Sequence, residues 1–82
     1  MRVNVLYFAV LKDVFKRDSE ELELPEGTTV SGLLEMLKGR EASSRKAWDA
    51  IAVAVNREYA RGETVLREGD EVALLPPVSG GL

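Results

Sequence analysis

Apolar residues recur at every second position in four stretches of the chain, and this spacing predicts β-strands. Residues 3–10 combine it with many β-branched and aromatic side chains, which favour strands. Residues 20–24 alternate acidic residues with leucine, as expected for a strand that pairs with the first one. Residues 51–56 and 71–75 complete the set of longer strands.

A helical spacing follows a turn at residues 25–27. Apolar residues then recur three and four positions apart, which predicts a helix. Thr28 or Thr29 can cap its start, and Gly39 can end it. Residues 11–16 predict a shorter helix of about one turn. The apolar face of the main helix consists of Val30, Leu33, Leu34 and Leu37.

The remaining segments are less regular. Residues 41–49 are mostly polar, and we expect Trp48 to anchor them against the core. Tyr59 lies in a short extension after the third strand, and residues 64–66 are expected to form a brief strand between two glycine-containing turns.

The resulting order is strand, strand, helix, strand, short strand, strand. Two opening strands, a helix that crosses their sheet, and a last strand that returns parallel to the first form the β-grasp (ubiquitin-like) fold. This is an α+β fold with a mixed sheet of about five strands, and its crossover obeys the usual handedness. The 82 residues suffice for one such domain. We expect the domain to span residues 1–75 and residues 76–82 to form a flexible tail.

The outward face of this sheet should be more apolar than is usual. The inward side chains would be Val3, Val5, Tyr7, Val72 and Leu74, and the outward ones Leu6, Phe8, Ala73 and Leu75. An apolar outward face is unusual for a sheet that is covered on one side. Scattered exposed apolar residues are ordinary, and residues 41–50 could cover these, but we favour a docking surface beside the tail.

The composition argues against chemistry performed by this chain alone. The chain contains no cysteine and no histidine, which removes thiolate nucleophiles, the usual general base and the commonest metal ligands. Acidic residues at positions 20, 21 and 23 could suggest a metal site, but carboxylates along an edge strand more often guard against aggregation. We therefore expect no metal site.

The net charge and the hydropathy of the chain argue against nucleic acids and membranes as partners. The net charge is −3 and the isoelectric point is about 4.9, which argues against nucleic acid because phosphates require a basic surface. The first residues do not form a secretory signal, and no apolar run approaches the roughly 18 residues that span a membrane. We expect a cytoplasmic protein that binds neither nucleic acid nor membrane.

The last residues form an unusual tail. Pro76 and Pro77 end the preceding strand, because proline cannot donate to a ladder, and Gly80 and Gly81 impose almost no preferred conformation. Fully stretched at roughly 3.3–3.6 Å per residue, residues 76–81 would reach about 20 Å. Such a tail could be a frayed end, or it could carry a terminal carboxyl group into a narrow channel of another protein.

Several short motifs follow one another along the chain. They are residues 6–9 (Leu-Tyr-Phe-Ala), 29–30 (Thr-Val), 54–56 (Ala-Val-Asn), 69–73 (Gly-Asp-Glu-Val-Ala) and 76–81 (Pro-Pro-Val-Ser-Gly-Gly). In this order they resemble the family of molybdopterin synthase small subunits (MoaD-type), over nearly the whole chain. The last two motifs together are the most specific part of the resemblance.

The resemblance implies a ubiquitin-like sulfur carrier in molybdenum cofactor biosynthesis. In that family an E1-like partner enzyme uses ATP to adenylate the terminal glycine carboxylate, and sulfur then replaces the adenylate to give a thiocarboxylate. The tail enters the large synthase subunit, where sulfur passes to cyclic pyranopterin monophosphate to make molybdopterin. The large subunit supplies the catalytic residues, the carrier binds no cofactor, and the two subunits form a heterotetramer.

By the same resemblance, Gly81 carries the adenylate and the thiocarboxylate, and Gly80 lets the tail thread the channel. Both glycines suit this chemistry, because a residue without Cβ leaves the carbonyl carbon open from several sides. The residues that would contact the partner proteins are Phe8, Tyr59, Leu75, Pro76, Pro77, Val78 and Ser79.

Leu82 departs from the family pattern, because the reactive chains of the family end in glycine. While Leu82 is attached, the carboxyl group of Gly81 is an amide and cannot be adenylated. Leu82 is then a residue added for expression, the end of a precursor that a protease trims, or a sign of another function; we rank the first two above the third. Two other functions stay open: a sulfur carrier for thiamine, cysteine or tRNA thiolation, and a ubiquitin-like interaction module or protein modifier.

Overall fold

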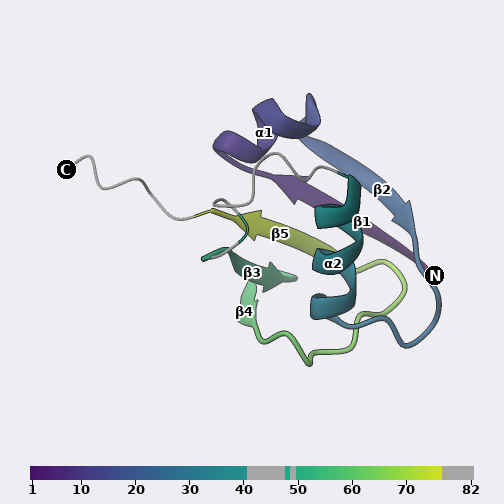
Figure 1. Ribbon diagram of the computed structural model, residues 1–82. Helices are drawn as coiled ribbons and strands as arrows, with labels where there is room; N and C mark the ends of the chain where they lie inside the picture. Colours follow the sequence, from purple (N-terminus) through teal and green to yellow (C-terminus); the bar gives the residue numbers. More distant parts are fainter. Residues whose placement is uncertain (41–47, 49, 77–82) are drawn as a thin grey trace.

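The computed structural model describes residues 1–40, 48 and 50–76, and Figure 1 shows their arrangement. In chain order the elements are β1 (Arg2–Tyr7), α1 (Val10–Phe15), β2 (Ser19–Glu23), α2 (Val30–Arg40), β3 (Ala52–Val55), β4 (Glu58–Ala60) and β5 (Glu71–Leu75). Within these residues the strands form one five-stranded sheet in the order β2-β1-β5-β3-β4.

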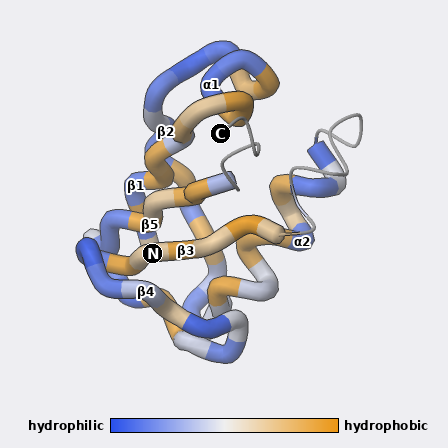
Figure 2. Tube along the Cα trace, turned by 90° about the vertical axis from the view of Figure 1, so that its left-hand side faces the viewer, coloured by the Kyte–Doolittle hydropathy of each residue, from blue (hydrophilic) through white to orange (hydrophobic). Residues whose placement is uncertain are grey.

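The sheet is mixed and has the predicted β-grasp topology. β5 is the central strand: it runs parallel to β1 on one side and antiparallel to β3 on the other. The β1–β2 and β3–β4 pairs are both antiparallel. α2 crosses one face of the sheet, and Figure 2, turned by 90°, shows it on one side of the strands. The prediction of a last strand beside and parallel to the first is confirmed.

The first strand is shorter than predicted. β1 ends at Tyr7 instead of continuing to residue 10, because the chain turns there: the amide of Leu11 donates a hydrogen bond of 3.0 Å to the carbonyl of Phe8. α1 begins within this turn. The hairpin of β3 and β4 contains Tyr59, so the predicted short extension is a true edge strand.

The predicted strand at residues 64–66 is wrong. The structure has a single bridge there, between Thr29 and Val65. The carbonyl groups of Gly62 and Thr64 instead accept hydrogen bonds, both of 2.9 Å, from the amides of Ser31 and Val30 in the first turn of α2. These amides have no acceptor within the helix. The loop therefore caps α2 with the groups that a strand would have used for pairing.

The core lies between α2 and the inner face of the sheet. Trp48 belongs to it, with 4% of its surface exposed, and its ring meets Phe15 edge-on with 6.0 Å between centroids. The predicted packing of Trp48 against the core is confirmed, while residues 41–47 and 49, which it was expected to anchor, lie outside the described residues. The other side chains of this core cluster are Val3, Val5, Tyr7, Leu11, Leu24, Val30, Leu33, Leu37, Val53, Leu66, Val72 and Leu74, and Ala54 is buried as well.

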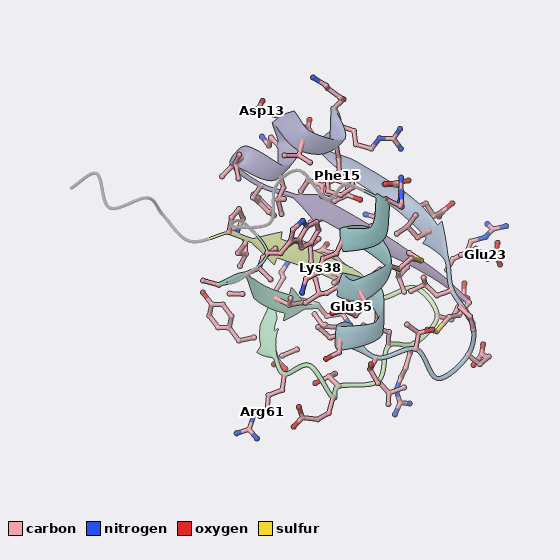
Figure 3. The ribbon with its side chains drawn as sticks, in the orientation of Figure 1. Asp13, Phe15, Glu23, Glu35, Lys38 and Arg61 are labelled. Atoms are coloured by element: carbon pink, nitrogen blue, oxygen red, sulfur yellow. The ribbon has the colours of Figure 1, made fainter. Side chains whose placement is uncertain are left out.

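Polar and aromatic side chains pack together at one end of the core. We call them the Glu20 cluster: Tyr7, Phe15, Arg17, Glu20 and Arg40. The hydroxyl of Tyr7 donates a hydrogen bond of 2.8 Å to one oxygen of Glu20, and Arg40 donates one of 3.1 Å to the other. Arg17 forms an ion pair with that second oxygen at 3.4 Å. Phe15 stacks on the ring of Tyr7 at 4.5 Å, and Figure 3 shows it between α1 and the end of α2. The cluster ties β1, β2 and the ends of both helices together.

Candidate functional site

The tail begins at the end of the central strand. Leu75, the last residue of β5, and Pro76 are both half-buried. Because β5 has a neighbour on each side, the point where the tail leaves the sheet is held by two ladders of hydrogen bonds. The predicted tail residues Pro77, Val78, Ser79, Gly80 and Gly81, together with Leu82, lie outside the described residues.

The register aligns apolar side chains across the outer face of four strands. Leu6 pairs with Ala73, Ala73 with Ala54, and Ala54 with Tyr59, so these four residues form one row from β1 to β4. Leu75 pairs with Ala52 in the next row toward the tail. Phe8 follows Leu6 just past the end of β1. We call Leu6, Phe8, Ala52, Ala54, Tyr59, Ala73 and Leu75 the outer apolar face.

The outer apolar face is exposed to solvent at its two aromatic side chains. Tyr59 is 80% exposed and Phe8 is 39% exposed, while Leu6, Ala73 and Leu75 are half-buried. α2 covers the opposite side of the sheet (Figure 2). Trp48 packs with Phe15 on that opposite side, although most of residues 41–50, which could have covered the outer face, lie outside the described residues. The strand register thus puts Tyr59 and Leu75 on one face of the sheet, and the exposed Phe8 follows directly after β1, the strand beside β5.

A polar border limits the outer apolar face at the end away from the tail. Asn4 pairs with Glu71 in the row beyond Leu6, and the guanidinium of Arg57 lies 3.9 Å from the Glu71 carboxylate. An apolar centre with a polar border is the usual anatomy of a protein–protein interface.

Two of the sequence motifs meet at this border. Asn56 of the Ala-Val-Asn motif donates a hydrogen bond of 2.9 Å to Asp70 of the Gly-Asp-Glu-Val-Ala motif, and it accepts one of 3.0 Å from the amide of Glu71. The other oxygen of Asp70 accepts a hydrogen bond of 2.8 Å from the amide of Arg67. These motif residues therefore join the β3–β4 turn to the start of β5 and align the central strand that carries the tail.

Sequence reasoning missed a groove of about 450 Å³ beside β4. Tyr59, Val65, Arg61 and Arg67 contribute to its walls, and Figure 3 shows Arg61 extending away from the sheet. The groove could not be foreseen because it depends on the loop that was predicted to be a strand.

The described residues contain no cluster of metal-binding side chains. No three histidine, cysteine, aspartate or glutamate side chains in this part of the chain gather closely enough to hold a metal ion. None of the helices that the structure describes is long and apolar enough to cross a membrane.

Comparison with known proteins shows the family to which this chain belongs. The model of the ThiS family matches residues 5–81, from the first strand through the tail sequence. The chain belongs to the ThiS family. A molybdopterin synthase sulfur carrier subunit from Mycobacterium tuberculosis is 38% identical over 99% of both chains. Another, from Chlamydomonas reinhardtii, is 34% identical and aligns with 99% of this chain and 100% of its own. The predicted kinship of this ThiS-family chain with the molybdopterin synthase sulfur carrier subunits is confirmed.

Solved structures of similar proteins have the same fold as this ThiS-family member. The putative subunit 1 of molybdopterin converting factor from Pyrococcus furiosus has a TM-score of 0.82 at 35% identity and covers 95% of this chain and 99% of its own. The small archaeal modifier protein SAMP1 from Haloferax volcanii has a TM-score of 0.83 at 31% identity, over 99% and 100%. A complex of subunits 1 and 2 of molybdopterin-converting factor from Helicobacter pylori gives 0.69 at 27% identity, also over 99% and 100%.

Proposed function

We propose that this chain is the sulfur carrier subunit of a molybdopterin synthase. The observation that carries the proposal is the 38% identity with such a subunit over 99% of both chains. The Gly80-Gly81 pair in the tail sequence supports it, because this is where the carrier chemistry would take place. Residues 76–81 would form the sulfur-bearing arm and residues 1–75 the domain that presents it.

The proposed chemistry takes place on the carboxyl group of Gly81. An E1-like enzyme joins that carboxylate to the α-phosphate of ATP and releases pyrophosphate. A sulfur nucleophile then attacks the carbonyl carbon, and AMP leaves with the electron pair of the broken C–O bond. The thiocarboxylate carries the sulfur to cyclic pyranopterin monophosphate in the large subunit. The carrier itself would hold no cofactor and supply no acid or base.

The outer apolar face is the proposed docking surface for the large subunit. Phe8, Tyr59 and Leu75 lie at the base of the tail, so binding there would direct residues 76–81 into the partner's active site. The H. pylori complex of subunits 1 and 2 supports a partner of this kind. A tail held in that site gains a high effective concentration of sulfur. The same face would dock on the activating enzyme in a separate complex, and a heterotetramer of two carriers and two large subunits would be the working assembly.

The intact mass of the protein purified without a tag from its own organism tests the chemistry. We expect a species that ends at Gly81, part of it heavier by the exchange of one oxygen for sulfur. A chain that keeps Leu82 while the cell makes molybdopterin would contradict the proposal, since its Gly81 carboxyl could not be activated. Chains ending at Gly81 and at Leu82, compared for adenylation with the purified activating enzyme, provide the control.

Docking is tested with two variants of matched exposure. Phe8 on the outer apolar face and Met36 on α2 are both 39% exposed. We expect Phe8→Asp to fold normally but to weaken binding of the large subunit at least tenfold, because a buried unpaired charge is costly. Met36→Asp should bind as the wild type does. Equal affinities of all three proteins in calorimetric titrations would rule out docking through Phe8.

A second candidate function is that of a protein modifier. The 31% identity and TM-score of 0.83 with SAMP1 over 99% of this chain favour it specifically. In that case the activated Gly81 would form isopeptide bonds with lysine side chains of other proteins. Peptides carrying a Gly-Gly remnant on lysine, detected by mass spectrometry only when the activating enzyme is present, would support this function.

A further inference from the structure

The edge strand β2 is open along its whole length. It is five residues long, pairs with β1 on one side without a bulge, and has no neighbour on its other side among the described residues. The opposite edge strand, β4, has only three residues. Natural proteins usually shorten, bulge or cover the edges of their sheets, because an open edge can pair with another strand. The regular edge of β2 is therefore a candidate site for an added strand.

The hydrogen bonds between β1 and β2 show which backbone groups face the open side. Met1 and Leu24 exchange two hydrogen bonds, of 2.8 and 2.7 Å, and the amide of Tyr7 donates one of 2.8 Å to the carbonyl of Asp18. Opposite residues of antiparallel strands alternate between pairs that exchange hydrogen bonds and pairs that do not. The even-numbered residues of β2 therefore bond to β1.

The odd-numbered residues Ser19, Glu21 and Glu23 consequently direct their N–H and C=O groups away from β1. In the part of the chain that the structure describes, no other segment bonds to these backbone groups. Figure 3 shows Glu23 at this border of the sheet. Each of the three residues thus offers one donor and one acceptor, at every second position, as the addition of a strand requires.

The side chains of β2 determine which strand fits. Glu21 and Glu23 lie opposite Asn4 and Arg2 of β1, and a groove of about 260 Å³ lies beside them. The Glu23 carboxylate is 3.8 Å from Arg2, but both side chains are mostly exposed, so this ion pair is weak. Leu22 between the glutamates is half-buried against the core. An added strand would fit best with basic residues beside the two glutamates and an apolar residue between them.

A second copy of this chain fits the edge poorly. In the antiparallel register that uses all three outward residues, Glu21 would lie opposite Glu21 of the other copy, and Ser19 opposite Glu23. Like charges directly opposite each other destabilise a pair of strands. The charges that disfavour self-pairing complement a basic strand, so they select between the two occupants.

We propose that the edge of β2 is a second docking surface, which binds an extended segment of a partner protein with basic and apolar residues in alternation. The segment would add a sixth strand to the sheet, with its backbone bonded to Ser19, Glu21 and Glu23 and its lysine or arginine side chains beside the glutamates. β2 lies two strands away from β5, which carries the tail. The inference therefore goes beyond the proposed function and does not rest on it.

The synthetic peptide acetyl-Thr-Lys-Val-Lys-Val-Thr-amide tests the proposal on the full chain. In the free protein, amide hydrogen exchange should be fast at Ser19, Glu21 and Glu23 and slow at Glu20 and Leu22. Saturating peptide should slow exchange at the first three amides by about tenfold or more. Exchange that stays fast there while the peptide is bound would reveal charge attraction alone and overturn the proposal. A peptide that does not bind at millimolar concentration would overturn it as well.

Charge reversal provides matched variants, because Glu23 is 76% exposed and Glu63, in the loop after β4, is 77% exposed. Glu21→Lys and Glu23→Lys should each weaken peptide binding roughly tenfold, since repulsion replaces attraction. Glu63→Lys changes the net charge equally and should keep the wild-type affinity. A peptide with glutamate in place of both lysines should bind the double variant Glu21→Lys/Glu23→Lys but not the wild type.

Two results with these proteins would contradict the proposal. An equal loss of affinity in Glu63→Lys would show that the peptide responds to net charge and not to the edge of β2. Dimers of the wild-type chain in sedimentation experiments that Glu21→Lys abolishes would make a second copy the occupant. Neither measurement involves the tail, so a failure of the proposed function would leave both of them decisive.

Discussion

Replacing Glu20 with glutamine should destabilise the fold at neutral pH, and less so in acid. The Glu20 carboxylate is 12% exposed and accepts hydrogen bonds from Tyr7 and Arg40. Burial by itself would raise the pKa of Glu20, but the hydrogen bonds from Tyr7 and Arg40 and the charges of Arg40 and Arg17 outweigh it and hold this pKa below its ordinary value. The carboxylate therefore favours the folded state.

The expected magnitude follows from the contacts. Glutamine offers one acceptor oxygen where glutamate offers two, and it carries no charge. The arginines at 17 and 40 are 51% and 42% exposed, so solvent screens much of their attraction. The oxygen of glutamine can still accept the hydrogen bond from the Tyr7 hydroxyl, so the main loss is the hydrogen bond from Arg40, which the amide nitrogen of glutamine cannot accept. We expect the free energy of unfolding to fall by about 1.5 kcal/mol. For a chain of this size the melting temperature should fall by roughly 6–12 °C.

The pH dependence provides the sharper test. Because folding lowers the pKa of Glu20, its contribution is fully present above the unfolded pKa of about 4.3 and is lost as the pH falls through the lower folded value. The stability difference between Glu20→Gln and the wild type should therefore be largest at pH 7 and should shrink as the pH falls through the lowered pKa of folded Glu20. Urea unfolding at a series of pH values from 7 downward, followed by the fluorescence of Trp48, the single tryptophan, measures this difference.

Glu23 on the same strand is the control. Its side chain is 76% exposed and pairs with Arg2 at 3.8 Å, so Glu23→Gln should change the stability by less than about 0.5 kcal/mol. Our reasoning would be refuted by a Glu20→Gln protein as stable as the wild type at pH 7. A difference that keeps its full size as the pH is lowered from 7 into the acid range, down to the point where the wild type unfolds, would refute it equally.

Three further substitutions test the account of the fold by denaturant unfolding. Leu74→Ala removes a fully buried side chain from the central strand and should cost about 3 kcal/mol; a cost below about 1 kcal/mol would contradict the assigned core. Gly69→Ala adds a methyl group in open space at φ 83°, so its cost of about 1 kcal/mol should arise from the backbone alone. A stable Gly69→Ala protein would show that this turn does not require a left-handed residue. Gly62→Ala would place its methyl group against the hydroxyl of Ser31 and should cost about 1 kcal/mol. In a Ser31→Ala background this cost should disappear, whereas an unchanged cost would place the conflict elsewhere.

Local periodicity was sufficient to predict most of the elements and their inward faces. The leucines of α2 and the alternation in β1 and β5 record which side of each element is buried, and this is a property of neighbouring positions along the chain. The β-grasp order and the kinship with sulfur carriers followed from the sequence of elements and motifs. The residues proposed for docking were named from the resemblance to the family, and their role stays a prediction; the strand register puts Leu75 and Tyr59 on the same face of the sheet.

Features that depend on contacts between distant segments could not be predicted in this way. Residues 64–66 have a strand-like composition, yet the carbonyl groups of Gly62 and Thr64 in this loop cap α2 because the fold brings the open amides of that helix beside it. From the sequence alone, Glu20 was expected to be a solvated carboxylate like its neighbours. In the structure it contacts Tyr7, Arg17 and Arg40. The row from Leu6 to Tyr59 exists only through the register of four strands. The sequence by itself determined which side chains avoid water, and the tertiary structure decided which polar groups and surface residues become neighbours, because hydrogen-bond partners and strand register are set by the packing of segments far apart in the chain.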